Sequence, residues 1–489
     1  MRKSGILLHP TSLPGDWGIG DLGKSAYRFV DFLEESGQQL WQILPLGPPG
    51  CGHSPYQVFS SMAGNPLLIS LHELVEQSLL LPEDLRRRPR FPDSVVAFHE
   101  VIPSKSRLIK KAAAAFFRQK AHPLRNEFLE FCAEMKSWLD PFAEFASLKE
   151  ENHDVAWNAW THKTVTNAQN LLDQKFIQFE FYRQWKLLKK YSNEHGIEII
   201  GDIPIFIAHD SADVWANPEL FDLDEEGNPN TIAGVPPDYF SKTGQCWGNP
   251  LYRWEVMERT GYAWWIERVK LMLEMVDIIR IDHFRGFEKF YAIPGGAATA
   301  VEGRWVQGPG DKFFEALKKS LGEVRFIAED LGHITPEVLA LRDRWGFPGM
   351  KVLQFAFSDH SPDNPHKPYN FVRNCIAYTG THDNDTTAGW LRQRTDSRAR
   401  AEIKTALQYL GKEEKDAVWS LIRLVMSSVA DTAILPMQDV LGLGTEARMN
   451  LPATVENNWR WRMREDQLSS DLAAKLRELN LIYGRLRPV

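Results

Sequence analysis

This sequence has few cysteines, no long apolar run and no block of basic residues. Its four cysteines, Cys51, Cys132, Cys246 and Cys375, are far apart among 489 residues and lack metal-ligand spacing. A disulfide scaffold and a zinc site are therefore not predicted, and free thiols in a reducing compartment are the simplest account. We expect neither a metal nor a cofactor.

The lack of apolar segments and of clustered positive charge also limits the possible surroundings. No stretch reaches the roughly 18 apolar residues of a membrane span, and the apolar run before His9 is too short for a signal peptide. The formal net charge of −7 argues against a nucleic-acid partner or an anionic membrane surface. We expect a cytoplasmic protein with no membrane or nucleic-acid partner.

Aromatic residues, by contrast, are plentiful. The chain has 17 Trp, 12 Tyr and 27 Phe, and 43% of its residues are hydrophobic, so a large core can be buried. Sugars present apolar C–H faces that pack on flat aromatic rings, which makes this composition suitable for a carbohydrate site. The alternative is that the aromatic residues simply fill the core.

Eight short apolar segments have the composition of buried strands. Parallel strands that are covered on both faces form continuous apolar runs, and amphipathic helical patterns fall between most of these segments. We therefore predict an α/β fold, a (β/α)₈ TIM barrel that forms a single catalytic domain over residues 1–489. The predicted strands are residues 5–10, 40–46, 197–207, 276–282, 324–330, 350–357, 375–383 and 432–443.

The predicted strands are unevenly spaced, which indicates insertions. Between the second and third strands the sequence shows helical patterns at 104–121, 124–148 and 170–195, and an irregular loop of that length is implausible. We predict a mostly helical insertion at 66–175. A second, loop-rich insertion with many Pro, Gly and aromatic residues is predicted at 208–255, after the third strand.

Three of the strands end in a carboxylate, and the first of these is Asp282. Arg280 and Asp282 are two residues apart, so their side chains share one face of the strand. A neighbouring guanidinium lowers the pKa of a carboxyl group. A nucleophile needs that ionised form, because a protonated acid cannot attack an anomeric carbon. The alternative is a structural Arg–Asp pair.

The second carboxylate, Glu329, ends the segment FIAEDLG. A glutamate beside an apolar strand can have its pKa raised by desolvation, which suits a general acid that protonates a leaving oxygen. Asp330 is adjacent but points to the opposite face, so the two residues compete for this role. The alternative is an aspartate that caps a helix beside an incidental glutamate.

The third carboxylate, Asp383, lies in TGTHDND, after His382. The small residues before it allow a ligand to approach closely, and His382 could donate a hydrogen bond to a sugar hydroxyl. The alternative is a turn that caps a helix. In a (β/α)₈ barrel the chemistry lies where the strands end, and glycosidic bond chemistry uses such carboxylates.

Two other patterns are rejected. Residues 18–23 match G-x-G-x-x-G, but Pro14, Asp16 and Trp17 separate these glycines from the preceding strand, unlike a dinucleotide site. Residues 222–227 resemble a calcium loop, but the twelfth position lacks glutamate, so we predict a turn in a hairpin.

Three loops have the composition of walls around a cleft. They are GHSPYQ at 52–57, which contains Tyr56, the Pro- and aromatic-rich segment at 234–252, and RMNLPAT at 448–454. Long ordered loops of this kind are often functional.

Together, these segments resemble the amylomaltases, the 4-α-glucanotransferases or disproportionating enzymes of glycoside hydrolase family 77 in the α-amylase clan. The resemblance runs almost from end to end, and its motifs follow the family's order. They are ILLHPTSLPG, GHSPYQ, GDIPIFI, GVPPDYFS with GQCWGNPLY, RIDHFRG, AEDLG, THDND and MNLPAT.

The resemblance assigns roles to individual residues. It implies that Asp282 is the nucleophile, Glu329 the acid/base and Asp383 the aspartate that stabilises the transition state. Sugar contacts around the scissile bond are implied for Tyr56, Asp202, Arg280 and His382, and positions in substrate-enclosing loops for Asp238, Gln245, Trp247 and Asn450. The resemblance also implies that no metal is bound.

The implied reaction is retaining transfer of α-1,4-glucan segments through a covalent glucosyl-aspartate. A maltooligosaccharide would be the donor, and the 4-hydroxyl of another glucan or of glucose the acceptor. The expected partners are maltooligosaccharides and α-1,4-glucans derived from starch or glycogen. The alternatives are an α-glucan hydrolase with the same carboxylates and a glucan-binding protein without activity, which the presence of all three carboxylates disfavours.

Overall fold

The computed structural model describes residues 2–237, 241–393, 397–411 and 413–487. At the centre of this described part, eight parallel strands close into a barrel, so the predicted (β/α)₈ architecture is confirmed. Around the barrel the strands follow the order β1 (Lys3–Leu7), β12 (Thr432–Pro436), β11 (Cys375–Tyr378), β10 (Gly349–Val352), β9 (Phe326–Ala328), β6 (Ile278–Asp282), β3 (Glu198–Pro204) and β2 (Leu40–Gln42).

Each of the eight predicted segments overlaps one barrel strand, but every one except 276–282 extends past the carboxyl end of its strand. The segment 350–357 leaves the barrel after Val352 and continues as a 3₁₀ turn, Leu353–Phe357. The segment 432–443 leaves it after Pro436 and continues as helix α16 (Met437–Val440). Apolar periodicity over so few residues does not distinguish a buried strand from a buried helical turn.

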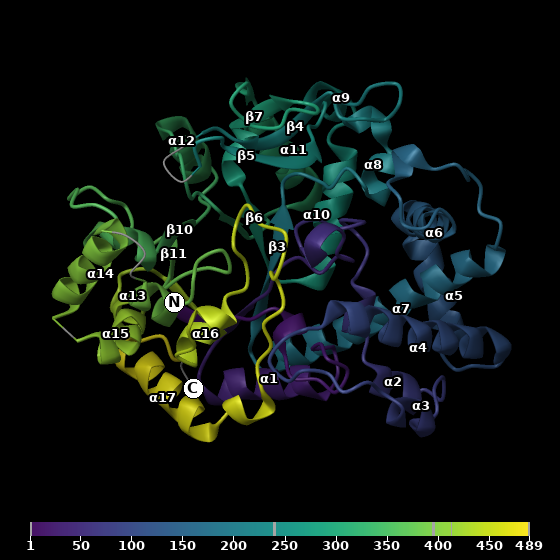
Figure 1. Cartoon of the computed structure of the whole chain (residues 1–489), viewed down its shortest axis with the longest axis horizontal. Helices are drawn as coiled ribbons and strands as arrows, with labels where there is room; N and C mark the ends of the chain where they lie inside the picture. The colour runs from purple at the N-terminus through teal and green to yellow at the C-terminus, as the bar shows by residue number, and fades with distance from the viewer. Residues whose placement is uncertain (1, 238–240, 394–396, 412, 488–489) are drawn as a thin grey trace.

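Amphipathic helices cover the outside of the barrel (Figure 1). Helix α1 (Lys24–Glu35) buries Ala26, Phe29, Val30 and Leu33, and the chain reverses after it at Gly37, whose φ of 70° suits glycine. Other covering helices are α10 (Ala263–Met275), α11 (Asp311–Leu321), α12 (Pro336–Arg344), α13 (Thr387–Arg392), α14 (Ser397–Leu410), α15 (Glu414–Ser427) and α17 (Ser470–Ile482).

A group of helices lies between β2 and β3 and occupies one side of the molecule, at the right of Figure 1. Its members are α2 (Leu71–Glu76), α3 (Pro82–Arg86), α4 (Phe98–Arg118), α5 (Arg125–Glu134), α6 (Lys136–Glu151) and α7 (Ala168–Glu194). The helical pattern predicted over 124–148 is two helices that meet at Met135. Helix α7 packs on α1, α4, α5 and α6 and leads into β3, so it joins these helices to the barrel.

A second, antiparallel sheet stands above the barrel in Figure 1. Its order is β5 (Gln245–Pro250), β4 (Thr231–Val235), β7 (Lys289–Pro294) and β8 (Arg304–Gln307), so residues that follow β3 pair with residues that follow β6. Helices α8 (Ala212–Ala216) and α9 (Trp254–Arg259) flank it. At 222–227 the chain makes a turn, in which Asp224 Oδ1 accepts the N–H groups of Glu226 and Asn228.

Much of the aromatic content lies in the core, as one of the two interpretations of the composition expected. Trp17, Trp41, Trp185 and Trp265 are almost completely buried. In the described part of the chain all four cysteines are free. None of the helices described there is both long and apolar enough to cross a membrane.

Candidate active site

The three candidate carboxylates come from strands whose carboxyl ends open on one side of the barrel. Asp282 is the last residue of β6, Glu329 directly follows β9, and Asp383 lies in the loop after β11. Strands β6 and β9 are neighbours in the barrel. Because the strands are parallel, their ends meet at one rim.

Asp282 belongs to a buried ionic network that starts at Arg280. Arg280 Nη1 is 2.9 Å from Asp282 Oδ1 and 2.6 Å from Asp202 Oδ2, and Arg280 is only 3% exposed. The Tyr56 hydroxyl donates to the same Asp202 oxygen at 2.8 Å. One guanidinium therefore bridges two carboxylates from the adjacent strands β3 and β6, as the i, i+2 spacing predicted for Arg280 and Asp282.

The predicted direction of the Asp282 pKa was wrong. Burial raises the pKa of Asp282 to about 6, although Arg280 acts in the opposite direction. Arg280 is shared with Asp202, whose negative charge further raises the Asp282 pKa. A pair of residues on one strand face is visible in a sequence, whereas desolvation and a competing third charge are not.

Glu329 is held by two backbone N–H groups. His283 donates to Glu329 Oε2 at 2.7 Å, and Leu331 donates to Glu329 Oε1 at 2.8 Å. Burial, followed by the negative charge of Asp282, raises the pKa of Glu329 to about 8. The two carboxyl groups thus differ in proton affinity, which is the division that an acid and a nucleophile need.

The rival residue Asp330 points away from this rim. It forms an ion pair with Arg342, and its Oδ1 accepts the N–H of Met350 at 2.7 Å. The alternation along the strand therefore separates a structural aspartate from a glutamate beside Asp282.

Asp383 is the most exposed of the three carboxylates, with 48% of its side chain accessible. Asn450 Nδ2 donates to Asp383 Oδ1 at 2.6 Å, and His382 Nε2 is 3.5 Å from Oδ2. The His382 ring stacks on Tyr56, with centroids 5.2 Å apart and planes 18° apart. The structure thus brings Asp383, His382, Asn450 and Tyr56 to one place.

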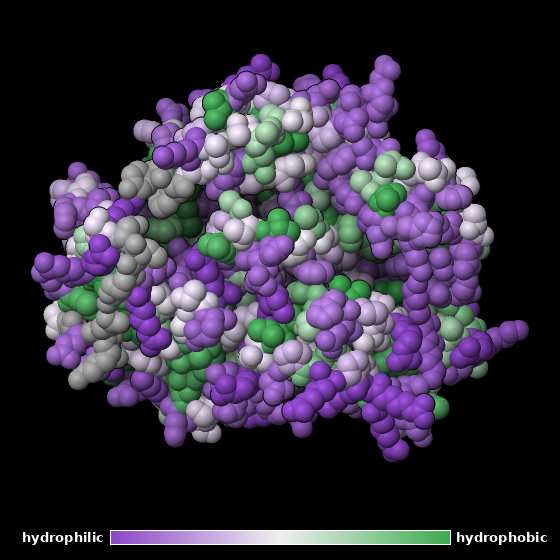
Figure 2. All heavy atoms as spheres, in the orientation of Figure 1, coloured by the Kyte–Doolittle hydropathy of each residue, from purple (hydrophilic) through white to green (hydrophobic). Residues whose placement is uncertain are grey.

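A cavity of about 420 Å³ lies over these residues. Its lining comes from six parts of the chain: the loop after β2, the carboxyl ends of β3 and β6, strand β5, the loop after β11 and the segment after α16. Figure 2 shows that this face is mainly hydrophilic and hollowed near its middle, and the yellow segment after α16 crosses in front of β6 and β3 in Figure 1. The predicted site residues that line the cavity are Tyr56, Asp282, His382, Asp383, Gln245, Trp247 and Asn450.

The remaining predicted residues are accounted for differently. Asp202 and Arg280 lie beneath the cavity and contact Tyr56 and Asp282. Glu329 does not line this cavity, but it contacts His283, which does. Asp238 lies outside the described residues.

Several further lining residues were not predicted individually. Gln57 donates to Asn249 Oδ1 at 2.9 Å and so joins two walls, and Trp459 lies beside Tyr56 and His382. Gln57, Asn249 and His283 lie inside motifs that the sequence had already singled out, so polarity within those motifs could have identified them. Trp459 follows the last motif and carries no such signal.

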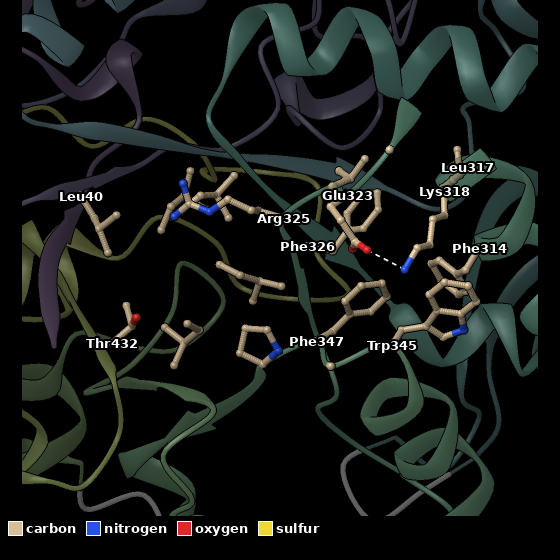
Figure 3. Close-up of a pocket in the computed structure, with 18 of the residues that line it drawn as sticks. Leu40, Phe314, Leu317, Lys318, Glu323, Arg325, Phe326, Trp345, Phe347 and Thr432 are labelled. Carbon is tan, nitrogen blue, oxygen red and sulfur yellow. Dashed lines mark ion pairs between the residues drawn. The ribbon is translucent and has the colours of Figure 1, made fainter. Parts of the chain in front are cut away.

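A second cavity, of about 350 Å³, lies at the opposite, amino end of the barrel (Figure 3). Phe314, Phe326, Trp345 and Phe347 dominate one side of it, and Lys318 forms an ion pair with Glu323. Glu323 is the only acidic residue among the described residues that line this cavity, and it is therefore paired. In the described ranges, no group of three or more His, Cys, Asp or Glu side chains could hold a metal ion.

Comparisons with known proteins show which family the chain belongs to. The sequence profile of a family described as 4-alpha-glucanotransferase matches residues 8–469. The chain belongs to this family, glycoside hydrolase family 77. It is an enzyme of the 4-α-glucanotransferase class.

Relatives of this glucanotransferase match it over nearly the whole chain. The 4-alpha-glucanotransferases of Synechocystis sp. and Thermus thermophilus are each 49% identical, over 99% of this chain and 98% and 99% of theirs, respectively. The solved amylomaltase of Streptococcus agalactiae in complex with acarbose is 38% identical, with a TM-score of 0.94 and complete coverage of both chains. An amylomaltase from Corynebacterium glutamicum, 20% identical with a TM-score of 0.79 over 99% of this chain and 74% of its own, shares the fold.

Proposed function

We propose that this glucanotransferase works by double displacement, with net retention at the anomeric carbon, on maltooligosaccharides and on α-1,4-glucans derived from starch or glycogen. The observation that carries the proposal is the pair Asp282 and Glu329, side by side at the ends of β6 and β9. Arg280 ion-pairs with Asp282, whereas backbone N–H groups hold Glu329.

In the first step an Asp282 oxygen attacks the anomeric carbon of the donor. The bond from that carbon to the leaving glucan's 4-oxygen breaks, and Glu329 transfers its proton to this oxygen. The product is a glucosyl ester of Asp282, and the fragment with the reducing end leaves. The order of the two pKa values supports this division, since near pH 7 Asp282 is mostly ionised and Glu329 mostly protonated.

In the second step Glu329 acts as the base. It takes the proton of the acceptor's 4-hydroxyl, whose oxygen attacks the anomeric carbon and displaces Asp282 as a carboxylate. Two inversions give net retention. This geometry requires the two carboxyl groups to be about 5–5.5 Å apart, without the wider gap that an inverting enzyme needs for water.

The other residues of the site are proposed to bind and orient the sugar. Asp383 would accept hydrogen bonds from sugar hydroxyls as positive charge develops on the ring, and Asn450 and His382 would hold its carboxylate in place. Tyr56 and Trp247 offer aromatic surface in the cavity wall, and Gln245 lies on the same strand as Trp247. Asp238, which lies in the sequence between β4 and β5, is also proposed to contact substrate.

Transfer rather than hydrolysis requires that an acceptor sugar outcompetes water at the ester. Loops and strand ends from six parts of the chain line the cavity. We propose that a bound acceptor fills the space between them and so keeps water from the ester. An α-glucan hydrolase with the same carboxylates is the rival function.

Incubation with maltotriose separates the two functions. A transferase releases glucose, builds a ladder of longer chains and conserves the number of reducing ends. A rise in reducing ends equal to the number of bonds broken would establish hydrolysis instead. NMR of the first products from an α-linked donor tests retention, because inversion would give β-anomers.

A further inference from the structure

His283 follows the proposed nucleophile and has an unusual backbone conformation. Its φ of 53° and ψ of 49° lie in the left-handed region, which residues other than glycine rarely occupy. The conformation turns the chain sharply from β6 into the 3₁₀ turn Phe284–Phe287, whose Gly286 N–H donates to the His283 carbonyl. Strained backbone of this kind persists only where the surroundings hold it in place.

Backbone hydrogen bonds join the chain on both sides of His283 to Glu329. The Glu329 N–H donates to the carbonyl of Ile281 at 3.0 Å, and the Phe284 N–H donates to the carbonyl of Glu329 at 3.1 Å. Between these two bonds, the His283 N–H points at the side chain of Glu329 and donates to Oε2 at 2.7 Å. An extended conformation at His283 would carry Phe284 away from the Glu329 carbonyl and so remove one of the two bonds that fix the position of this N–H.

The imidazole of His283 has a separate environment. Its ring meets Trp247 edge to face, with centroids 4.8 Å apart, and Phe206 lies 6.4 Å away. Burial, with Arg285 as a smaller cause, lowers the pKa of His283 to about 3, so the ring is neutral at neutral pH and adds no positive charge beside Glu329. In the described structure the direct polar contact between His283 and Glu329 is the hydrogen bond from the His283 backbone N–H to the Glu329 side chain.

We propose that His283 is a positioning residue for Glu329: its left-handed backbone lets the flanking residues bond to Glu329 on both sides, which holds the His283 N–H at Oε2 and so fixes the orientation of the acid/base carboxyl group beside Asp282. This inference rests on the proposed function, because it assumes that Glu329 is the acid/base. Histidine and asparagine are both enriched among non-glycine residues with left-handed backbone, whereas β-branched residues avoid it. This difference allows the backbone role to be tested by substitution.

The test compares His283→Asn, His283→Gly and His283→Val. Asn and Gly accept the left-handed conformation and keep the N–H, so kcat on maltotriose should stay within about threefold of wild type. Val disfavours it, and a displaced acid should cost about 100-fold in kcat, with little change in KM. Loss of a hydrogen bond that favours the carboxylate should also move the basic limb of the pH profile upward.

A donor that needs no acid separates positioning from general damage. Fluoride leaves α-maltotriosyl fluoride without a proton, so the pre-steady-state release of fluoride by His283→Val should stay within about threefold of wild type. His153→Val is the matched control, because His153 is also left-handed, with φ of 56°, but is exposed in the turn after α6. It should leave both rates unchanged.

Three results would overturn the proposal. Equal loss of activity in the Gly and Val variants would assign the effect to the imidazole. Equal slowing of maltotriose and fluoride reactions by His283→Val would indicate a distorted site, and wild-type rates in that variant would remove any role. Glu329→Gln distinguishes failure of the premise: full activity of that variant rejects the acid/base assignment itself, whereas its inactivity beside an active His283→Val rejects only the positioning.

Discussion

The two ends of the barrel hold cavities of similar size, about 420 Å³ at the carboxyl end and about 350 Å³ at the amino end. Strands β6 and β9 reach both cavities. Their first residues, Ile278 and Phe326, line the cavity at the amino end, and their other ends lead to Asp282 and Glu329. At the amino end, acidic and basic side chains form ion pairs with one another. Glu198 forms ion pairs with Lys3 and Arg325. Glu323 forms an ion pair with Lys318, which Figure 3 shows.

At the carboxyl end, carboxylates outnumber the cations that could neutralise them. Arg280 is shared by Asp202 and Asp282, and Glu329 relies on backbone N–H groups. Carboxyl groups crowded in this way acquire raised and separated pKa values. Cavity volume alone therefore does not identify an active site, whereas desolvated carboxyl groups that share too few cations do.

The strongest test of this comparison is Asp282→Asn. The amide is nearly isosteric but cannot attack the anomeric carbon, so kcat on maltotriose should fall by roughly 10⁴-fold or more. Circular dichroism and the thermal unfolding temperature should stay close to wild type. Activity within about tenfold of wild type would remove Asp282 as nucleophile.

Glu329→Gln should have the next largest effect. Loss of general acid/base catalysis should lower kcat on maltotriose by about 10²–10⁴-fold. Initial rates with maltotriosyl fluoride should be much less affected, because fluoride needs no proton to leave. A variant equally slow with both donors would assign Glu329 a different role.

The pH profile of the wild-type enzyme should be bell-shaped. Asp282 must be ionised, so kcat/KM should fall as the pH drops below about 6; Glu329 must be protonated, so it should fall as the pH rises above about 8. Initial rates from pH 4 to 10, at fixed ionic strength, measure both limbs. A profile that stays flat from pH 7 to 10 would contradict the raised pKa of Glu329.

Asn450→Ala should have a smaller effect. It removes the 2.6 Å hydrogen bond to Asp383, but Asp383 is half exposed and water can replace part of the interaction. We expect a loss of about 3- to 10-fold in kcat/KM, and Asn450→Asp, which places a like charge beside Asp383, should lose more. If both variants matched wild type, Asn450 would not orient Asp383.

The smallest effect on activity is expected at the amino end. Phe326→Ala should destabilise the fold by about 3–5 kcal/mol, because a buried aromatic side chain is removed from the barrel. At a temperature where the variant is folded, kcat should equal that of wild type. Urea denaturation and maltotriose kinetics together check this, and a selective loss of kcat would show that the two ends are coupled.

Much of the fold and site could be predicted because local sequence encodes it. The eight apolar segments predicted the barrel strands, and the ends of β6 and β9 carried Asp282 and Glu329 as expected. Strand ends were less predictable, as at Val352 and Pro436, because a short apolar run suits a strand or a helical turn. The long-range pairing of β4 with β7 depends on contacts that no local pattern contains.

The sequence by itself determined which residue types stand at the strand ends, since the two-residue strand period places Arg280 and Asp282 on one face and Glu329 and Asp330 on opposite faces. Only the tertiary structure decided their ionisation, because the pKa of Asp282 depends on burial and on Asp202 from another strand. It also decided which loops enclose the cavity and that His283 turns its N–H toward Glu329. Charge interactions and desolvation act through space, so residues far apart in the chain set them.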